Sequence, residues 1–178
     1  MEPAYLARGG TVLRLAMIYG PHDPQRREEL VLRRVRAGRT RIPIGPAATL
    51  LTRLHVDDTA RAILAALDQP SVAAGQVFNI GEAQAYSVRA WMRLILDAAG
   101  HSAELVRVPE ENLPADLGLT RTHAQHLLVS SRKAMDLLGW RPEDGATAVA
   151  RSVRWHLDHP PDDASTDFAE DDKALALV

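Results

Sequence analysis

The chain has 178 residues, of which 46% are hydrophobic and 25% charged, with a formal net charge of -2. These values fit one soluble domain of about 150 residues plus a tail, without a whole-molecule field that attracts nucleic acid or an anionic membrane. The absence of cysteine excludes disulfides, cysteine-ligated zinc and a thiol nucleophile. Arg14 interrupts the nearest apolar run, so we expect no signal peptide or membrane span and a cytoplasmic location.

The first fifty residues predict a strand, a helix and a second strand. Residues 11–18 form a nearly continuous apolar run closed by a Gly-Pro pair, which is typical of a buried strand in a parallel sheet. Asp23 is a candidate N-cap for a helix over 24–37, which a glycine follows. Residues 42–45 predict a short strand, and 46–52 predict a loop.

The next helix is expected to start at the cap residue Asp57 and to end before Pro70. Its neighbours Asp58 and Arg61 are expected to point outward. The face predicted to pack inward consists of Ala60, Ile63, Leu64 and Leu67.

The remaining folded part predicts two strands and three helices around a poorly patterned stretch, 109–128. The strands are predicted over 77–80 and 104–108. The helices are predicted over 88–99 after the cap Ser87, over 131–138 before Gly139, and over 146–157. We therefore assign residues 1–160 to one folded unit. Residues 161–178 are rich in aspartate and glutamate among small residues, and we predict a disordered acidic tail there.

Four segments carry a family resemblance, and they occur at residues 11–21 (TVLRLAMIYGP), 54–60 (LHVDDTA), 77–81 (VFNIG) and 137–142 (LLGWRP). Each motif alone is weak, but their order and spacing are specific. The chain resembles the C-terminal half of an extended short-chain dehydrogenase/reductase of the NAD-dependent epimerase/dehydratase type. The resemblance implies an α/β, truncated Rossmann-like fold: the last sheet strands plus a small C-terminal substrate-binding domain.

Two motifs of that family are not found in this sequence. One is the glycine-rich turn that binds the dinucleotide pyrophosphate, and the other is the Tyr-x-x-x-Lys pair that supplies the acid/base tyrosine. The tyrosines are Tyr5, Tyr19 and Tyr86, and none has a lysine four residues later. NAD or NADP is thus implied by the resemblance, but we expect this chain alone not to bind it, and we assign no catalytic residue. If Met1 is the true start, the dinucleotide-binding half is absent.

The resemblance also suggests positions around the cofactor. Leu15, Ala16 and Met17 correspond to the loop whose backbone faces the nicotinamide. Many members that use nucleotide sugars read Pro-x-Asn here, so Met17 lacks an amide for a polar substrate. A polar sugar nucleotide is therefore the less expected substrate.

Tyr19, Arg53 and His55 are the candidate substrate-binding residues. Family members place a phosphate-pairing arginine four residues before the motif histidine, where this chain has Leu51. Arg53 is shifted by two positions, which keeps its side of a strand, but we favour a solvated surface arginine. For His55 we favour a local structural role beside the helix cap.

Two broader hypotheses remain open. The chain supplies the substrate pocket of a reductase or epimerase acting on a small or hydrophobic carbonyl or alcohol, or it is a non-catalytic binding or interaction domain. A homo-oligomer or a complementing chain is a possible partner. The arginine-rich block 26–41 is read as a solvated helix face rather than a nucleic-acid site, since 4% aromatics leave little to stack bases. No metal site is expected, because the pairs His123/His126 and His156/His159 lack a clear third ligand.

Overall fold

A computed structural model describes residues 2–162 and 165–178. The helices are α1 (Glu2–Leu6), α2 (Glu29–Arg36), α3 (Val56–Asp68), α4 (Pro70–Ala73), α5 (Val88–Ala98), α6 (Arg132–Leu138), α7 (Gly145–Asp158) and α8 (Ala169–Leu175). The strands are β1 (Val12–Leu15), β2 (Met17–Tyr19), β3 (Arg41–Ile44), β4 (Leu50–Leu51), β5 (Arg53–His55), β6 (Val77–Ile80), β7 (Tyr86–Ser87) and β8 (Glu104–Arg107). Single 3-10 turns span Glu110–Asn112 and Ala115–Thr120.

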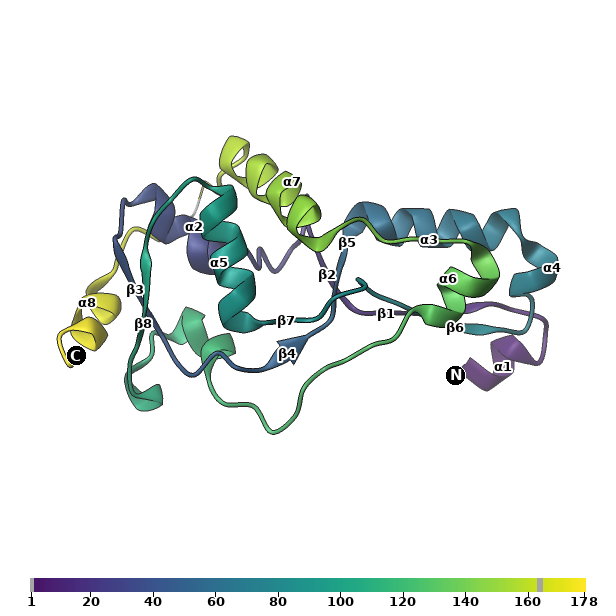
Figure 1. Ribbon diagram of the computed structural model, residues 1–178, viewed down its shortest axis with the longest axis horizontal. Helices are drawn as coiled ribbons and strands as arrows, with labels where there is room; N and C mark the ends of the chain where they lie inside the picture. The colour runs from purple at the N-terminus through teal and green to yellow at the C-terminus, as the bar shows by residue number, and fades with distance from the viewer. Residues whose placement is uncertain (1, 163–164) are drawn as a thin grey trace.

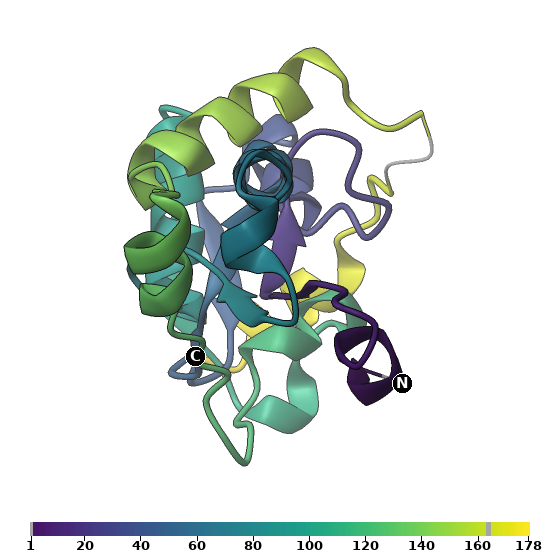
Figure 2. The ribbon, with the colours of Figure 1, turned by 90° about the vertical axis from the view of Figure 1, so that its right-hand side faces the viewer.

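Four two-stranded ladders organise the chain, and three of them are parallel: β1 with β6, β2 with β5, and β3 with β8. The fourth, β4 with β7, is antiparallel. The molecule is elongated: β3, β8, α2, α5 and α8 lie at one end and β1, β6, α3, α4 and α6 at the other, with β2 and β5 between them (Figures 1 and 2). The predicted α/β class with parallel strands is confirmed.

The apolar run predicted as one strand changes partner at Ala16. Its first half pairs with β6 and its second half with β5, while the Ala16 N–H donates to the Ile80 carbonyl at 2.8 Å. Gly81 permits this crossing, because a Cβ there would lie 2.7 Å from Thr52 Cγ2. The β1–β6 ladder thus ends where the β2–β5 ladder begins, at the centre of the molecule.

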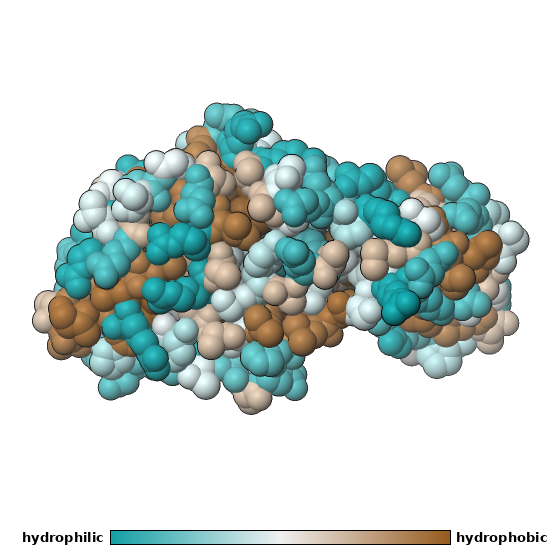
Figure 3. Space-filling model, in the orientation of Figure 1, coloured by the Kyte–Doolittle hydropathy of each residue, from teal (hydrophilic) through white to brown (hydrophobic). Residues whose placement is uncertain are grey.

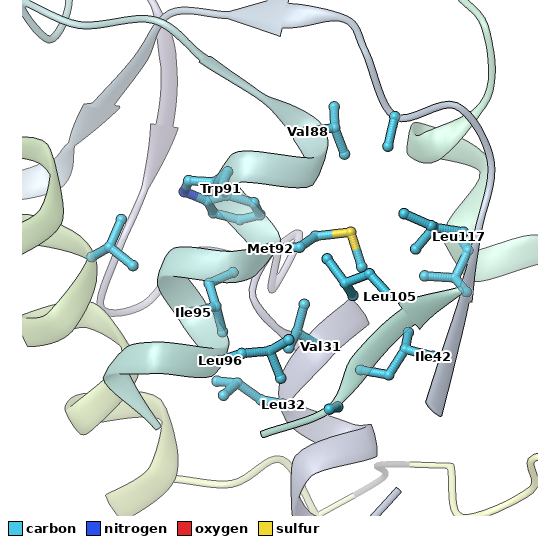
Figure 4. Close-up of a cluster of buried hydrophobic side chains, with 14 of the residues drawn as sticks. Val31, Leu32, Ile42, Val88, Trp91, Met92, Ile95, Leu96, Leu105 and Leu117 are labelled. Carbon is cyan, nitrogen blue, oxygen red and sulfur yellow. The ribbon is translucent and has the colours of Figure 1, made fainter. Parts of the chain in front are cut away.

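The larger core lies between α2, α5, β3 and β8 (Figure 4). The Ser87 hydroxyl caps α5 by accepting the Ala90 N–H, as predicted. The helix then buries Trp91, Met92 and Ile95. Each such side chain contributes about 1.5–3 kcal/mol by leaving water.

The predicted inner face of α3 is wrong. Ile63, Leu64 and Leu67 are 43%, 57% and 67% exposed, whereas the smaller Ala62 and Ala66 are buried. Small side chains let the helix approach the strands closely, so they take the inner face. Asp58 is also buried rather than outward, and its carboxylate accepts the Glu143 N–H at 3.2 Å.

Helix α2 starts later than predicted, since residues 23–27 form a turn. The Asp23 carboxylate accepts the N–H groups of Gln25 and Arg27, which holds the chain out of the helix. The predicted loop over 46–52 contains β4.

The expectation of disorder over 161–178 does not hold for residues 169–175, which form α8. Its Asp171 pairs with the buried Arg34, and Ala174 and Leu175 are buried. Residues 163–164 lie outside the described part. Among the described residues, no helix has the length and apolar character needed to cross a bilayer.

Candidate functional site

The central junction of parallel strands brings the candidate side chains together. In the β2–β5 register, Met17 pairs with Arg53 and Tyr19 pairs with His55. Glu82, just after β6, is held against β5 because its N–H donates to the Arg53 carbonyl at 2.8 Å. Open α/β sheets commonly bind ligands beyond the carboxyl ends of their strands, so this is the place to look for a site.

A hollow of about 500 Å³ opens at this junction. It is lined by Leu15, Ala16, Met17, Ile18, Tyr19, Pro21, His22, Asp23, Pro24, Gln25, Arg27 and Val56. The three positions expected to face the nicotinamide, Leu15 to Met17, therefore line one hollow together with Tyr19. Leu15 is 41% exposed there, while Tyr19 is buried and presents only a small part of its surface.

A larger groove of about 800 Å³ adjoins the hollow and shares Met17, Gln25 and Arg27 with it. The groove runs along α2. The residues that line it beyond the shared ones are Arg26, Glu29, Leu30, Arg33, Ala115, Asp116, Leu119, Ser165, Asp167, Glu170 and Asp171. Hollow and groove together form a continuous candidate binding surface.

Arg53 lies behind the hollow and is fully buried, so its predicted solvation is wrong. Its guanidinium stacks over the Trp91 ring at 4.3 Å from the centroid, and Nη1 donates to the carbonyls of Leu51 and Tyr86 at 3.4 Å. Within the described part of the chain, Nε and Nη2 have no hydrogen-bond acceptor. Burial lowers the pKa of Arg53 to about 10, although nearby Glu82 favours the charged form.

Glu82 was not predicted as a site residue. It is buried, and burial raises its pKa to about 7, although the Tyr19 hydroxyl and the Arg53 guanidinium favour the carboxylate. Burial likewise raises the pKa of Tyr19, and Glu82 adds to that effect. The signal in the sequence is a charged residue two positions after the strand 77–80.

His55 makes the contacts of a structural residue. Its Nδ1 accepts the Asp57 N–H at 3.2 Å and thereby caps α3, so the predicted cap Asp57 is the capped residue instead. Burial lowers the pKa of His55, and the Arg151 guanidinium, 3.1 Å away, lowers it further. His55 does not line the hollow, and its role in substrate binding stays a prediction.

Residues 3–81 match the model of the NAD dependent epimerase/dehydratase family. This stretch contains β1 and β2, whose residues line the hollow, and their ladder partners β6 and β5. The resemblance to the NAD-dependent epimerase/dehydratase family that the sequence predicts is confirmed over this stretch.

Individual relatives agree with this assignment. A UDP-glucose 4-epimerase of Corynebacterium glutamicum is 32% identical over 90 residues, which are 51% of this chain and 25% of that protein. The chloroplast stem-loop binding protein of 41 kDa b of Arabidopsis thaliana is 28% identical over 172 residues, 93% of this chain and 44% of that protein. The chain therefore spans less than half the length of these curated relatives.

A solved structure shares the fold of this chain. The crystal structure of a UDP-glucose 4-epimerase with UDP-glucose from Thermotoga maritima superposes with a TM-score of 0.63 at 24% identity. The match covers 84% of this chain and 46% of that one. It establishes that the two share a fold over this part.

Among residues 2–162 and 165–178, no pyrophosphate site of the family's kind is formed. Helices α3 and α5 each follow a strand directly, and in each a side chain accepts one N–H of the first turn: His55 accepts the Asp57 N–H, and Ser87 accepts the Ala90 N–H. Helix α3 also carries Asp57 and Asp58 in its first turn, which disfavour an anion there. The expected place of Leu15, Ala16 and Met17 beside the nicotinamide stays a prediction.

Proposed function

We propose that this chain provides the substrate side of an NAD(P)-dependent epimerase/dehydratase or reductase that acts on a carbonyl or alcohol. One observation carries the proposal: Leu15, Ala16 and Met17 line a hollow at the carboxyl ends of parallel strands, and Met17 also lines the larger groove. A ligand in the groove would thus reach the positions expected beside the nicotinamide.

The proposal places residues 1–160 in that substrate-binding role and leaves the dinucleotide and the acid/base tyrosine to another polypeptide segment. Its support is the capped helix starts described above, together with the missing Gly-rich and Tyr-x-x-x-Lys motifs. Tyr19 is a poor proton donor in place of the missing tyrosine, since burial and Glu82 raise its pKa.

The second candidate is a non-catalytic binding domain, which is favoured by the extent of the match to a protein named for stem-loop binding. The block 26–41 argues against nucleic acid as the ligand. Six of its arginines already pair with carboxylates: Arg27, Arg33, Arg34, Arg36, Arg39 and Arg41. Contacts of this kind leave few cations to neutralise phosphates.

Methionine methyl NMR on the full chain tests the first candidate. The chain has four methionines, and among the described ones Met17 lines both the hollow and the groove, while Met92 lies in the larger core and Met135, on α6, packs against the smaller core. We expect uncharged ketones and secondary alcohols, such as acetophenone and cyclohexanol, to shift the Met17 methyl signal in a saturable way. The Met92 and Met135 signals should stay in place.

A Met17→Leu variant identifies the signal and keeps the apolar volume. A saturable shift of the Met135 methyl signal without a shift of the Met17 signal would contradict the proposal. So would a Met17 signal that none of the ketones and alcohols shifts.

A further inference from the structure

The segment 165–175, called the acidic segment below, is bound to the arginines of α2. The Arg33 guanidinium donates to the backbone carbonyls of Ser165 and Asp167, and the Phe168 ring lies 4.7 Å below the Arg33 guanidinium carbon. Arg34 makes a two-pronged pair with Asp171, with N–O distances of 2.7 and 2.8 Å. The acidic segment therefore occupies cationic groups that would otherwise face the groove.

The acidic segment is anchored by apolar contacts as well as by charge. Ala174 belongs to the larger core and Leu175 is buried, while α8 lies against β3. The segment is therefore a fixed wall of the groove.

This wall changes the sign of the formal charge carried by the residues that line the groove. Three arginines and five carboxylates line it, which gives a formal charge of -2. The acidic segment supplies three of the carboxylates: Asp167, Glu170 and Asp171. Without them the lining would carry three arginines against two carboxylates, a formal charge of +1. The field of these charges acts on a ligand in the groove and is screened as the salt concentration rises.

We propose that the acidic segment sets the substrate class of the groove, excluding nucleoside diphosphates and admitting uncharged or cationic substrates. The inference rests on the proposed function, in which the groove receives the substrate. The apolar Met17 at the junction of groove and hollow fits an uncharged reacting group. A relative with UDP-glucose in its crystal structure thus shares the fold but differs in substrate charge.

The test compares UDP-glucose binding to the wild-type chain and to the double variant Asp167→Asn, Glu170→Gln. Both residues are exposed. The asparagine amide at 167 keeps an oxygen that accepts the Ala169 N–H, and the glutamine amide at 170 keeps one that accepts the Ala115 N–H. Binding is followed at the Met17 methyl signal. The matched control, Asp68→Asn with Asp97→Asn, removes two exposed carboxylates that do not line the groove.

The wild-type chain and the control should bind UDP-glucose with millimolar affinity or weaker. The double variant should bind roughly three- to tenfold more tightly at low salt, with the gain shrinking as salt rises. Micromolar binding to the wild-type chain would overturn the inference, as would a double variant no tighter than the control.

The ketones and secondary alcohols used to test the proposed function distinguish a failure of that function from a failure of the charge selection. If ketones and alcohols leave Met17 unmoved while the double variant gains UDP-glucose affinity as expected, the proposed substrate fails and the charge selection stands. If the panel shifts Met17 and the wild-type chain binds UDP-glucose tightly, the charge selection alone fails.

Discussion

Replacing Asp171 by asparagine removes one charge from a buried ion pair while keeping the side-chain shape. Arg34 and Asp171 are 0% and 1% exposed, and their two hydrogen bonds join residues 137 positions apart. Breaking a buried pair by removing one partner costs about 3–5 kcal/mol. Because Arg34 keeps two hydrogen bonds to Asp116, we expect the free energy of unfolding to fall by less than this, by about 2–3 kcal/mol.

For a domain of this size the loss corresponds to a fall in Tm of roughly 4–12 °C, measurable by differential scanning calorimetry. The matched control is Asp172→Asn, because Asp172 is 62% exposed and pairs with Arg39 at the surface. Exposed pairs contribute about 0–1 kcal/mol. Equal Tm values for the two variants would refute the reasoning, since they would show that the acidic segment adds nothing to folding through Asp171.

Three further predictions concern pH, cofactor and association. Because burial raises the pKa of Glu82 to about 7, the folded state binds this proton more tightly than the unfolded chain, and stability falls as pH rises from about 4.5 to 7. Glu82→Gln should therefore gain up to about 3 kcal/mol relative to wild type near pH 8 but not near pH 4.5, measured by urea unfolding; an equal difference at both pH values contradicts this. Isothermal titration of the full chain with NADH and NADPH should show no tight binding, because the starts of α3 and α5 are capped by side chains, and micromolar affinity would contradict it. Sedimentation equilibrium should show self-association that rises with concentration, whereas a monomer at all concentrations argues against an open apolar surface.

Local sequence signals predicted most elements well. Ser87 and Gly139 were recognised as helix-end residues, and the structure gives Ser87 a capping bond and Gly139 a left-handed backbone with φ of 65°. Such signals work because the atoms they join are only a few residues apart. The strand 77–80 was likewise visible from its apolar run.

Failures occurred where the partner lies far away in the chain. Composition alone makes Asp171 a solvated tail residue, but a buried guanidinium on α2 holds it. Arg53 was expected at the surface, but Trp91 covers its guanidinium, and nothing near Arg53 in sequence indicates that ring. Long-range pairing of charged side chains therefore limited the prediction of both the tail and the site.

The error on α3 has a different origin and bears on partners. Its inner face uses Ala62 and Ala66 against the strands, and its other face exposes Ile63, Leu64 and Leu67. A helix that is apolar on two faces is normally enclosed by a second layer. Among the described strands, β1 pairs with β6 alone, so the same end of the molecule also has an unpaired strand edge. Other exposed apolar side chains lie at Leu127, Leu128 and Leu137, and brown patches interrupt the hydrophilic surface in Figure 3. An open strand edge beside an uncovered apolar helix favours association with another polypeptide segment, which is what the proposed substrate-side role requires.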